Sequence, residues 1–380
     1  MSKRVMLVFG TRPEATKMAP VYFALKEASE IEPVICVSAQ HREMLDQVLA
    51  HFGMSPEYDL NIMTPRQSLN AITCRAIDGL DRVIEEARPD LVLVHGDTTT
   101  TMAASLAAFH KMIPVAHVEA GLRTHDKLAP YPEEMNRRIA DAVSDLHFAP
   151  TSWSKQNLLR EAIPERHIFV TGNTAVDALL WTVRECYEFQ DEELAAFRWE
   201  EHPMTIAVEV HRRENWGEGM HQIGRALRRI AATSGVTMIV SLHKNPEVRE
   251  VLPHYLDKLS NVMLHEPFSY PDWANLMKRS RLVITDSGGL QEEAPSLGLP
   301  VLVCRHKTER PEAVEAGTVK LVGTDEQAIF ESAQELLYDG PEYSRMCSAK
   351  NPYGDGKAGL RTAEAIKYYF GLARRPPDFA

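Results

Sequence analysis

Short apolar runs, each followed by a longer stretch of helical periodicity, constrain the fold of this 380-residue chain more than any other feature. Nearly uninterrupted apolar runs are typical of strands that are covered on both faces of a parallel sheet. A first set of runs comprises residues 5–9, 34–37, 91–95, 115–118, 146–149 and 168–170. A second set comprises residues 206–210, 238–241, 261–264, 282–285 and 301–304. The alternation predicts an α/β protein with two Rossmann-like, doubly wound domains.

An acidic segment at residues 185–203 interrupts the alternation. We place the domain junction between residues 173 and 203, and predict an N-terminal domain over 1–175 and a C-terminal domain over 176–358. The last helix, at about 359–373, follows the turn-rich stretch NPYGDG. We expect the terminal segment 359–380 to pack back on the N-terminal domain.

Composition excludes several classes of partner. The formal net charge of −11 argues against a nucleic-acid-binding protein, which usually has a basic face. No segment approaches the roughly 20 apolar residues of a membrane span, so no membrane partner is expected. The cysteines are scattered, odd in number and without a zinc-binding spacing, which favours free thiols in a cytoplasmic protein. They are Cys36, Cys74, Cys186, Cys304 and Cys347.

The stretch VFGTRPEATK predicts a helix start after the first strand. Thr11 and Glu14 have the spacing of a capping box, and Pro13 favours the first turn. Arg12 stands where a helix N-terminus favours an anion. If the helix began at Arg12, Lys17 would lie about 140° around its axis, so both could reach one ligand only if Arg12 belonged to the loop. The alternative is a pair of solvated surface cations.

Carboxylates follow two neighbouring strands of the first half. Asp97 comes after the strand at 91–95, and its position alone favours a role as a helix cap. Glu119 comes after the strand at 115–118, and the stretch YPEEMNRR adds the pair Glu133 and Glu134. Two carboxylates that share a site repel each other, so one pKa rises and an acid and a base can coexist near neutrality.

Cations and glycines follow the strands of the second half. His211 precedes Arg212 and Arg213, a set suited to phosphate oxygens, and His243 precedes Lys244. In TDSGGLQEEAPSLG, the segment Ser287, Gly288 and Gly289 opens a helix, where small residues let phosphate approach backbone N–H groups. Glu292 or Glu293 could accept hydrogen bonds from ribose, and Arg310 adds a cation.

Fingerprints for other chemistries are missing from the sequence. It contains no G-x-G-x-x-G, no G-x-x-x-x-G-K-[ST], no H-E-x-x-H and no G-x-S-x-G pattern. Readings as an NAD enzyme, a P-loop ATPase, a zinc protease or a serine hydrolase therefore have no support.

These motifs together resemble the non-hydrolysing UDP-N-acetylglucosamine 2-epimerase family. The matching stretches run in order along nearly the whole chain: FGTRPEATKMAP, AQHREMLDQV, VHGDTTTT, HVEAGLRT, YPEEMNRR, TGNTAVDAL, HRREN, DSGGLQEEAPSLG, TERPEAVEAGT and NPYGDG. The resemblance implies a GT-B arrangement with the sugar nucleotide in the interdomain cleft, usually in a homodimer. It implies that UDP-GlcNAc and UDP-ManNAc interconvert through 2-acetamidoglucal, with no NAD or metal.

The resemblance also implies roles for matched residues. Asp97 and Glu119 would exchange protons, with Glu133 as an auxiliary carboxylate. Residues that would hold UDP are Arg12, Lys17 and His211 at the diphosphate, Ser287, Gly288 and Gly289 at phosphate, Glu293 at the ribose, and Arg310. Candidates for an activator site that binds a second UDP-GlcNAc are Gln40, Gln47, Arg66, Arg212 and His243. A purely structural network between the domains is the alternative for this last set.

Two departures from the family pattern affect local contacts. His306 follows Arg305 where an aspartate is common, and Glu209 stands where a small or hydroxyl residue is usual. An alternative substrate is a modified UDP-sugar, such as a UDP-2,3-diacetamido hexuronate. A GT-B glycosyltransferase, which needs an acceptor, and a non-catalytic sensor of sugar nucleotides are further alternatives.

Overall fold

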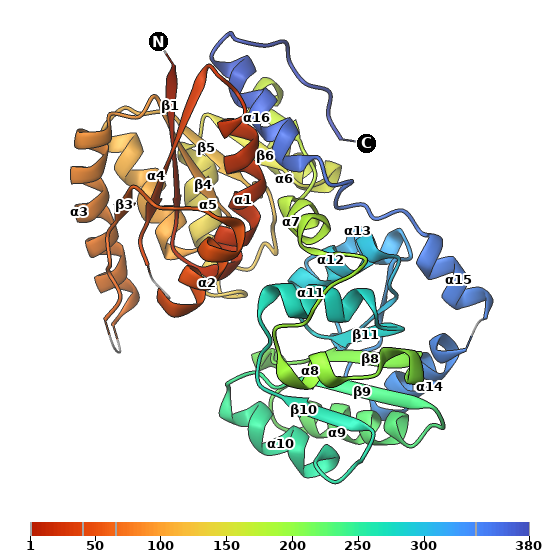
Figure 1. Cartoon of the computed structure of the whole chain (residues 1–380). Helices are drawn as coiled ribbons and strands as arrows, with labels where there is room; N and C mark the ends of the chain where they lie inside the picture. Colours follow the sequence, from red (N-terminus) through yellow and green to blue (C-terminus); the bar gives the residue numbers. More distant parts are fainter. Residues whose placement is uncertain (1, 40–41, 65–66, 339, 380) are drawn as a thin grey trace. The chain divides into compact units, whose positions relative to one another are not determined.

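The computed structural model describes residues 2–39, 42–64, 67–338 and 340–379, without the side chains of 42–44. The chain divides into two compact units. Unit 1 consists of Met1–Ala178 and Tyr353–Ala380, and unit 2 consists of Leu179–Pro352. Unit 1 is therefore built from both ends of the chain, and unit 2 from one continuous segment (Figure 1).

Unit 1 is organised around a parallel sheet of seven strands in the order β3-β2-β1-β4-β5-β6-β7. The strands are β1 (Lys3–Phe9), β2 (Ile31–Val37), β3 (Tyr58–Asp59), β4 (Leu91–His95), β5 (Val115–Val118), β6 (Leu146–Ala149) and β7 (Ile168–Val170). The helices are α1 (Arg12–Lys26), α2 (Arg42–Phe52), α3 (Leu69–Ala87), α4 (Thr99–His110), α5 (Glu133–Val143), α6 (Ser152–Arg160), η1 (Glu165–His167), α7 (Thr174–Thr182) and α16 (Ala358–Tyr369). Helices connect the parallel strands, as crossover connections require.

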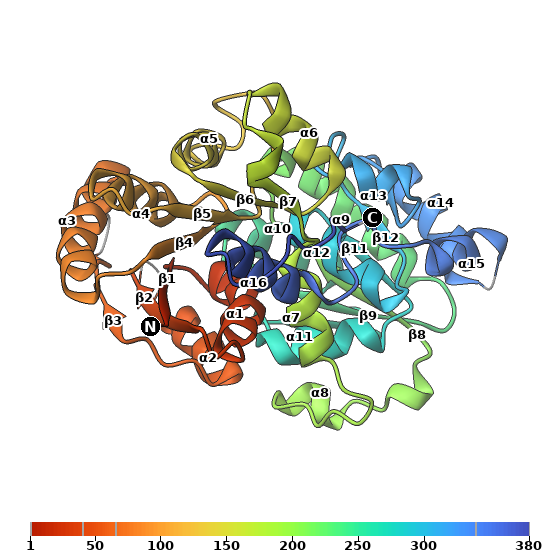
Figure 2. The ribbon, with the colours of Figure 1, turned by 90° about the horizontal axis from the view of Figure 1, so that it is seen from above.

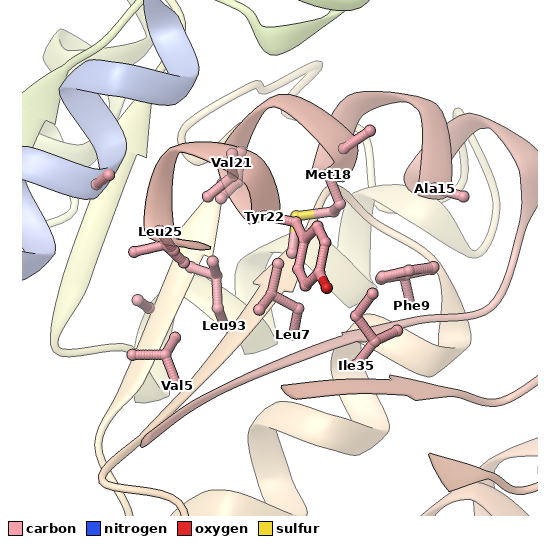
Figure 3. Close-up of a cluster of buried hydrophobic side chains, with 14 of the residues drawn as sticks. Val5, Leu7, Phe9, Ala15, Met18, Val21, Tyr22, Leu25, Ile35 and Leu93 are labelled. Atoms are coloured by element: carbon pink, nitrogen blue, oxygen red, sulfur yellow. The ribbon is translucent and has the colours of Figure 1, made fainter. Parts of the chain in front are cut away.

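Alternate residues of β1 enter two cores, one on each face of the sheet. Val5, Leu7 and Phe9 pack with α1 and α16, as Figure 3 shows for the α1 side. Met6 and Val8 pack on the other face, with α3 and α4. Burial on both faces explains why the sequence of this strand is continuously apolar.

The C-terminal helix α16 lies beside α1 in both views of the ribbon (Figures 1 and 2). A Cβ added at Gly359 would lie 2.7 Å from the backbone carbonyl carbon of Pro20, so only glycine permits this approach. Asp177 of α7 also accepts hydrogen bonds from the backbone N–H groups of Ala358 and Gly359. These contacts attach the end of the chain to unit 1.

Unit 2 contains a parallel sheet of six strands in the order β10-β9-β8-β11-β12-β13. The strands are β8 (Met204–Glu209), β9 (Val236–Ser241), β10 (Val262–His265), β11 (Leu282–Thr285), β12 (Val301–Val303) and β13 (Val319–Leu321). The helices are α8 (Glu192–Ala196), η2 (Trp199–Glu201), η3 (Arg213–Asn215), α9 (Glu218–Ala231), α10 (Pro246–Leu256), α11 (Tyr270–Lys278), α12 (Gly288–Glu293), η4 (Ala294–Leu297), α13 (Pro311–Glu315), α14 (Glu326–Leu337) and α15 (Pro341–Ser348). This strand order is that of the Rossmann fold.

The predicted α/β class with two parallel sheets is confirmed, and every predicted strand is present with ends shifted by at most a few residues. The sequence analysis missed β3 and β13, which are too short to show a period. Within the described ranges, no helix is both long enough and apolar enough to cross a membrane.

Candidate active site

The strand order of unit 1 brings its candidate carboxylates to one edge of the sheet. β4 pairs with β5 so that His95 lies opposite Val118, and Asp97 and Glu119 follow these residues. The topology reverses between β1 and β4, which is the switch point where open α/β sheets bind ligands. Both carboxylates therefore stand next to the position that this fold favours for a ligand.

Glu119 is held by polar side chains of three other elements. Lys17 of α1 forms an ion pair with Oε2, and Asn173 Nδ2 donates a hydrogen bond of 3.2 Å to the same oxygen. Nε2 of His95 lies 3.7 Å from it. The backbone φ of Glu119 is +66°, a left-handed conformation that is strained for a residue with a side chain. Such strain persists where several contacts hold a residue in place, often at a functional site.

Asp97 is not the helix cap that its position alone suggested. Thr98 is the N-cap of α4, because its side chain accepts a hydrogen bond from the backbone N–H of Thr101. The Asp97 carboxylate instead forms an ion pair with Arg137 of α5, and Asn136 Nδ2 donates a 3.0 Å hydrogen bond to the Asp97 carbonyl. Asp97 is thus available for a role other than capping.

The two glutamates of YPEEMNRR have different environments. Glu134 is fully buried and accepts hydrogen bonds from the backbone N–H groups of Thr124 and His125, so it braces the loop after β5. Glu133 opens α5, and its buried Oε2 has no hydrogen-bond partner within the described residues. Glu133 therefore fits an auxiliary carboxylate better than Glu134 does.

The helix after β1 begins at Arg12, so the loop position that would let Arg12 and Lys17 share a ligand is not observed. The capping box predicted for Thr11 and Glu14 is present. Glu14 also accepts a 2.7 Å hydrogen bond from the hydroxyl of Thr98, which joins the ends of β1 and β4. Lys17 reaches Glu119, whereas Arg12 starts the helix on another side of its axis.

A buried network of charged groups supports this edge from beneath. His117 Nδ1 lies 2.6 Å from Asp141 Oδ1, and its Nε2 lies 2.7 Å from the carbonyl oxygen of Gly96. Because both partners are acceptors, both nitrogens donate and the ring is positively charged. Arg123 bridges Asp141 and Glu161. The network fixes the turn that precedes Asp97.

The corresponding switch point of unit 2 lies between β8 and β11, and Asp286 organises it. This fully buried carboxylate accepts hydrogen bonds from the backbone N–H groups of His211 and Arg212, and from Asn215 Nδ2 at 2.9 Å. The sequence analysis missed Asp286, although it directly follows a strand as Asp97 nearly does. That position was the signal that could have found it.

Of the candidates for an activator site, unit 2 brings two close to His211. The rings of His211 and His243 stack at a centroid distance of 4.8 Å, and Arg212 follows His211 in the chain. Gln47 is exposed on α2 in unit 1. The two others, Gln40 and Arg66, lie outside the described residues.

The doubled glycine has two different environments. A Cβ at Gly288 would lie 2.5 Å from an Arg310 guanidinium nitrogen, whereas a Cβ at Gly289 would have no neighbour within 4 Å. Arg310 Nε donates a 2.7 Å hydrogen bond to Glu292, which is fully buried. Glu292, to which the sequence analysis gave no role, therefore holds Arg310 against Gly288, and the open space is at Gly289.

Neighbouring candidates of α12 are only partly explained by internal contacts. Ser287 is the N-cap residue, but its side chain makes no capping hydrogen bond. Glu293 is half-buried at the end of the helix.

Arginines surround a second carboxylate near Arg310. Glu309 forms ion pairs with Arg305 and Arg310, and Arg212 adds its charge. Burial opposes ionisation of Glu309, but the charges of Arg310, Arg305 and Arg212 outweigh it and lower its pKa. An ionised Glu309 fixes the guanidinium groups around this part of unit 2.

The two departures from the family pattern lie at less buried positions. His306 is exposed, and its Nε2 lies 3.4 Å from the Thr324 hydroxyl, after β13. Glu209 ends β8, and its carbonyl accepts a 2.7 Å hydrogen bond from Thr285. The backbone contact of Glu209 is independent of its side chain.

Comparison with known proteins identifies the family. The sequence matches the family described as UDP-N-acetylglucosamine 2-epimerase over residues 23–367. The chain belongs to this family. The resemblance noted from the sequence motifs is therefore confirmed.

Members of the epimerase family are similar over nearly their full length. UDP-N-acetylglucosamine 2-epimerase of Escherichia coli (strain K12) is 53% identical over 374 residues, which cover 96% of this chain and 98% of that protein. The protein of the same name from Bacillus subtilis (strain 168) is 51% identical over 384 residues, with 99% and 98% covered.

Solved structures of the epimerase family share the fold. The structure of UDP-GlcNAc 2-epimerase from Neisseria meningitidis bound to UDP-GlcNAc has a TM-score of 0.87 and 48% identity, covering 96% of this chain and 100% of that one. A structure of S. aureus MnaA with UDP has a TM-score of 0.91 and 47% identity, with 100% of both chains covered.

Proposed function

We propose that this protein interconverts UDP-GlcNAc and UDP-ManNAc by inverting the configuration at C2 of the sugar. The observation that carries the proposal is the pair of carboxylates at adjacent strand ends of unit 1, Asp97 beside Arg137 and Glu119 beside Lys17. Acid–base chemistry at one carbon needs two such groups, one to remove a proton and one to return it. Family membership supports the same reaction.

The reaction that we propose is an elimination followed by an addition. A carboxylate removes the C2 proton, the electron pair of that C–H bond forms the C1=C2 double bond, and UDP leaves with the electrons of the C1–O bond. The intermediate is 2-acetamidoglucal. A phosphate oxygen of UDP then bonds to C1 while the other face of C2 receives a proton. No net oxidation occurs, so the reaction requires no electron carrier.

We assign the exchanging roles to Asp97 and Glu119 and an auxiliary role to Glu133. Cations and backbone N–H groups would stabilise the charge that develops on departing UDP, which is electrostatic catalysis. Residues that we propose for UDP are Arg12, Lys17, His211, Ser287, Gly288, Gly289, Glu293 and Arg310. The open space at Gly289 supports an approach of phosphate there, whereas Arg310 occupies the side of Gly288.

Three further features extend the proposal. A second UDP-GlcNAc would act as an activator through Arg212 and His243, and the stacking of His243 on His211 supports a link to the diphosphate. We also propose a homodimer and a cytoplasmic location, as the resemblance to the family implied.

The test is to incubate the protein with UDP-GlcNAc in deuterated water and to follow the sugar by NMR. We expect UDP-ManNAc with deuterium at C2. Neither exchange at C2 nor UDP-ManNAc, with or without added activator, would refute the function for this substrate. Free ManNAc and UDP as main products would indicate a hydrolysing enzyme. Exchange on a UDP-2,3-diacetamido hexuronate alone would indicate the modified sugar.

A further inference from the structure

His95 is a buried histidine at the acidic edge of unit 1 to which the proposed reaction assigns no role. It ends β4, and the residue is 3% exposed. Neither of its ring nitrogens forms a hydrogen bond within the described part of the chain, whereas His117 on the next strand uses both nitrogens. Buried polar atoms usually have partners, so the imidazole is placed for a contact that another state of the site supplies.

The surroundings of His95 keep its ring neutral. The charged groups that face it are Glu119, Lys17, His117 and Asp97. Burial lowers the pKa of His95 to about 4, although the charge of Glu119 opposes this change. A neutral imidazole has one N–H group. Nε2 is the nitrogen that faces Glu119, at 3.7 Å from Oε2.

A small movement would convert this approach into a hydrogen bond. N–H···O bonds extend to about 3.2 Å, so the 3.7 Å separation needs only a slight shift of either side chain. In the structure, Lys17 forms an ion pair with the same oxygen of Glu119. The ammonium group therefore competes with His95 for this carboxylate.

The substrate offers Lys17 a second anion. In the proposed reaction Lys17 stabilises the diphosphate, and an ammonium that turns to the diphosphate weakens its contact with Glu119. Withdrawal of a nearby cation raises the basicity of a carboxylate. Glu119 would become a stronger base once substrate has bound, but it would lose the donor that orients it.

We propose that His95 is a positioning residue for Glu119, and that it donates its Nε2 proton to this carboxylate when Lys17 turns to the diphosphate. The inference rests on the proposed function for the role of Lys17. A neutral donor orients the carboxylate and lowers its basicity less than an ammonium does. With Asn173, two uncharged donors then hold Glu119 in a backbone conformation that needs support.

Three replacements separate the donor from packing. His95→Gln places an amide donor near the position of Nε2, His95→Asn places it near Nδ1, and His95→Phe keeps a ring without donors. For Asn and Phe, we expect kcat for deuterium exchange at C2 to fall about 10- to 100-fold, as for other residues that orient a reactive group. KM and the affinity for UDP should be unchanged. His95→Gln should recover most of the lost rate.

A matched control is His147→Gln, which changes another buried histidine of the same sheet, one that bonds to the backbone carbonyl of Asp141. It should lower stability while kcat is kept. Wild-type kcat in His95→Asn or His95→Phe would overturn the positioning role. A loss of UDP affinity in parallel with kcat in these variants would also overturn it, because the role would then be structural.

Nitrogen NMR of the histidine rings in the unaltered protein with UDP tests the inference without turnover. We expect the proton of His95 on Nε2, with the signal assigned by its absence in His95→Gln. A proton on Nδ1 would overturn the inference. An unaltered protein that exchanges no deuterium at C2 would instead overturn the proposed function, and the NMR measurement would still decide the role of His95.

Discussion

At the scale of single residues, the two candidate acid–base carboxylates differ in how firmly their cations are held. Arg137 pairs with Asp97 and also lies 3.6 Å from Glu134, so two carboxylates fix its planar guanidinium. Lys17 pairs with Glu119 through a compact charge on a flexible stem. Glu119 is therefore the carboxylate whose cation can leave, which suits a base that must take a proton from carbon.

We predict that Asp97→Asn and Glu119→Gln each lower turnover by about 10²- to 10⁴-fold, because each removes one proton-transfer group. The affinity for UDP should change little, since neither carboxylate is assigned to the nucleotide. Epimerisation by NMR and UDP binding by calorimetry measure the two effects. Glu85→Gln, at an exposed carboxylate paired with Lys111, is the control and should keep full activity. Near-normal turnover in either variant would remove that residue from the proposed acid–base pair.

Asp141 makes the stability of unit 1 sensitive to acid. Burial opposes its ionisation, but the charge and hydrogen bond of His117 and the charge of Arg123 outweigh burial and lower its pKa. Because the pKa in the folded state is below the unfolded value of about 3.9, the contribution is present above that pH. It is lost as the pH falls through the lower, folded value.

We predict that Asp141→Asn destabilises unit 1 by about 3–5 kcal/mol at neutral pH, because it leaves two buried cations without their carboxylate. The variant should also lose less stability than the unaltered protein between pH 5 and pH 3. Urea unfolding followed by amide exchange in the strands of unit 1 measures both effects. A pH dependence equal to that of the unaltered protein would contradict the role of Asp141.

At the scale of elements, the short helix α12 combines a packing glycine with a glycine that faces open space. Arg310 fills the side of Gly288 and is held there by Glu292. Nothing within 4 Å fills the corresponding side of Gly289. The same residue type thus serves two purposes at adjacent positions, close packing and access.

We predict opposite effects for alanine at these two glycines. Gly288→Ala should destabilise unit 2 by about 1–3 kcal/mol, because the added methyl group overlaps the Arg310 guanidinium. Gly289→Ala should leave stability equal or raise it by up to about 1 kcal/mol through helix propensity, and should weaken UDP binding. Thermal unfolding and calorimetry with UDP give the two quantities. Unchanged UDP affinity in Gly289→Ala would argue against phosphate at this position.

At the scale of the whole molecule, the chain leaves unit 1, builds unit 2 from one continuous segment and returns to complete unit 1. The returning segment contributes a fully buried Tyr353 and the buried Ile366 of α16. Each unit has its own sheet and its own apolar cores. Removal of the last segment should therefore damage one unit and spare the other.

We predict that truncation after Pro352 unfolds unit 1, because α1 loses the helix that covers it and the Asp177 carboxylate loses two N–H donors. Unit 2 should keep its protection against hydrogen exchange. Mass spectrometry of amide exchange, peptide by peptide, measures both in one experiment. Full protection of β1 and α1 in the truncated chain would show that α16 is dispensable for unit 1.

The strand-end rule found Asp97, Glu119 and His211 from the sequence because it depends on local order alone. It could not assign their partners. Arg137 lies 40 positions from Asp97 in sequence, and Asn173 lies 54 positions from Glu119. Pairings over such separations depend on how helices pack on the sheet, which periodicity does not specify.

The sequence by itself determined the α/β class, the sheet-forming segments, the capping box at Thr11 and Glu14, and the family. These depend on short-range patterns: uninterrupted apolar runs, residues at fixed spacing and motifs in order. Only the tertiary structure decided that Thr98 and not Asp97 caps α4, and that Glu292 holds Arg310. It also decided that His95 faces Glu119. In each of these cases several partners were compatible with the local sequence, and packing brought one of them within reach.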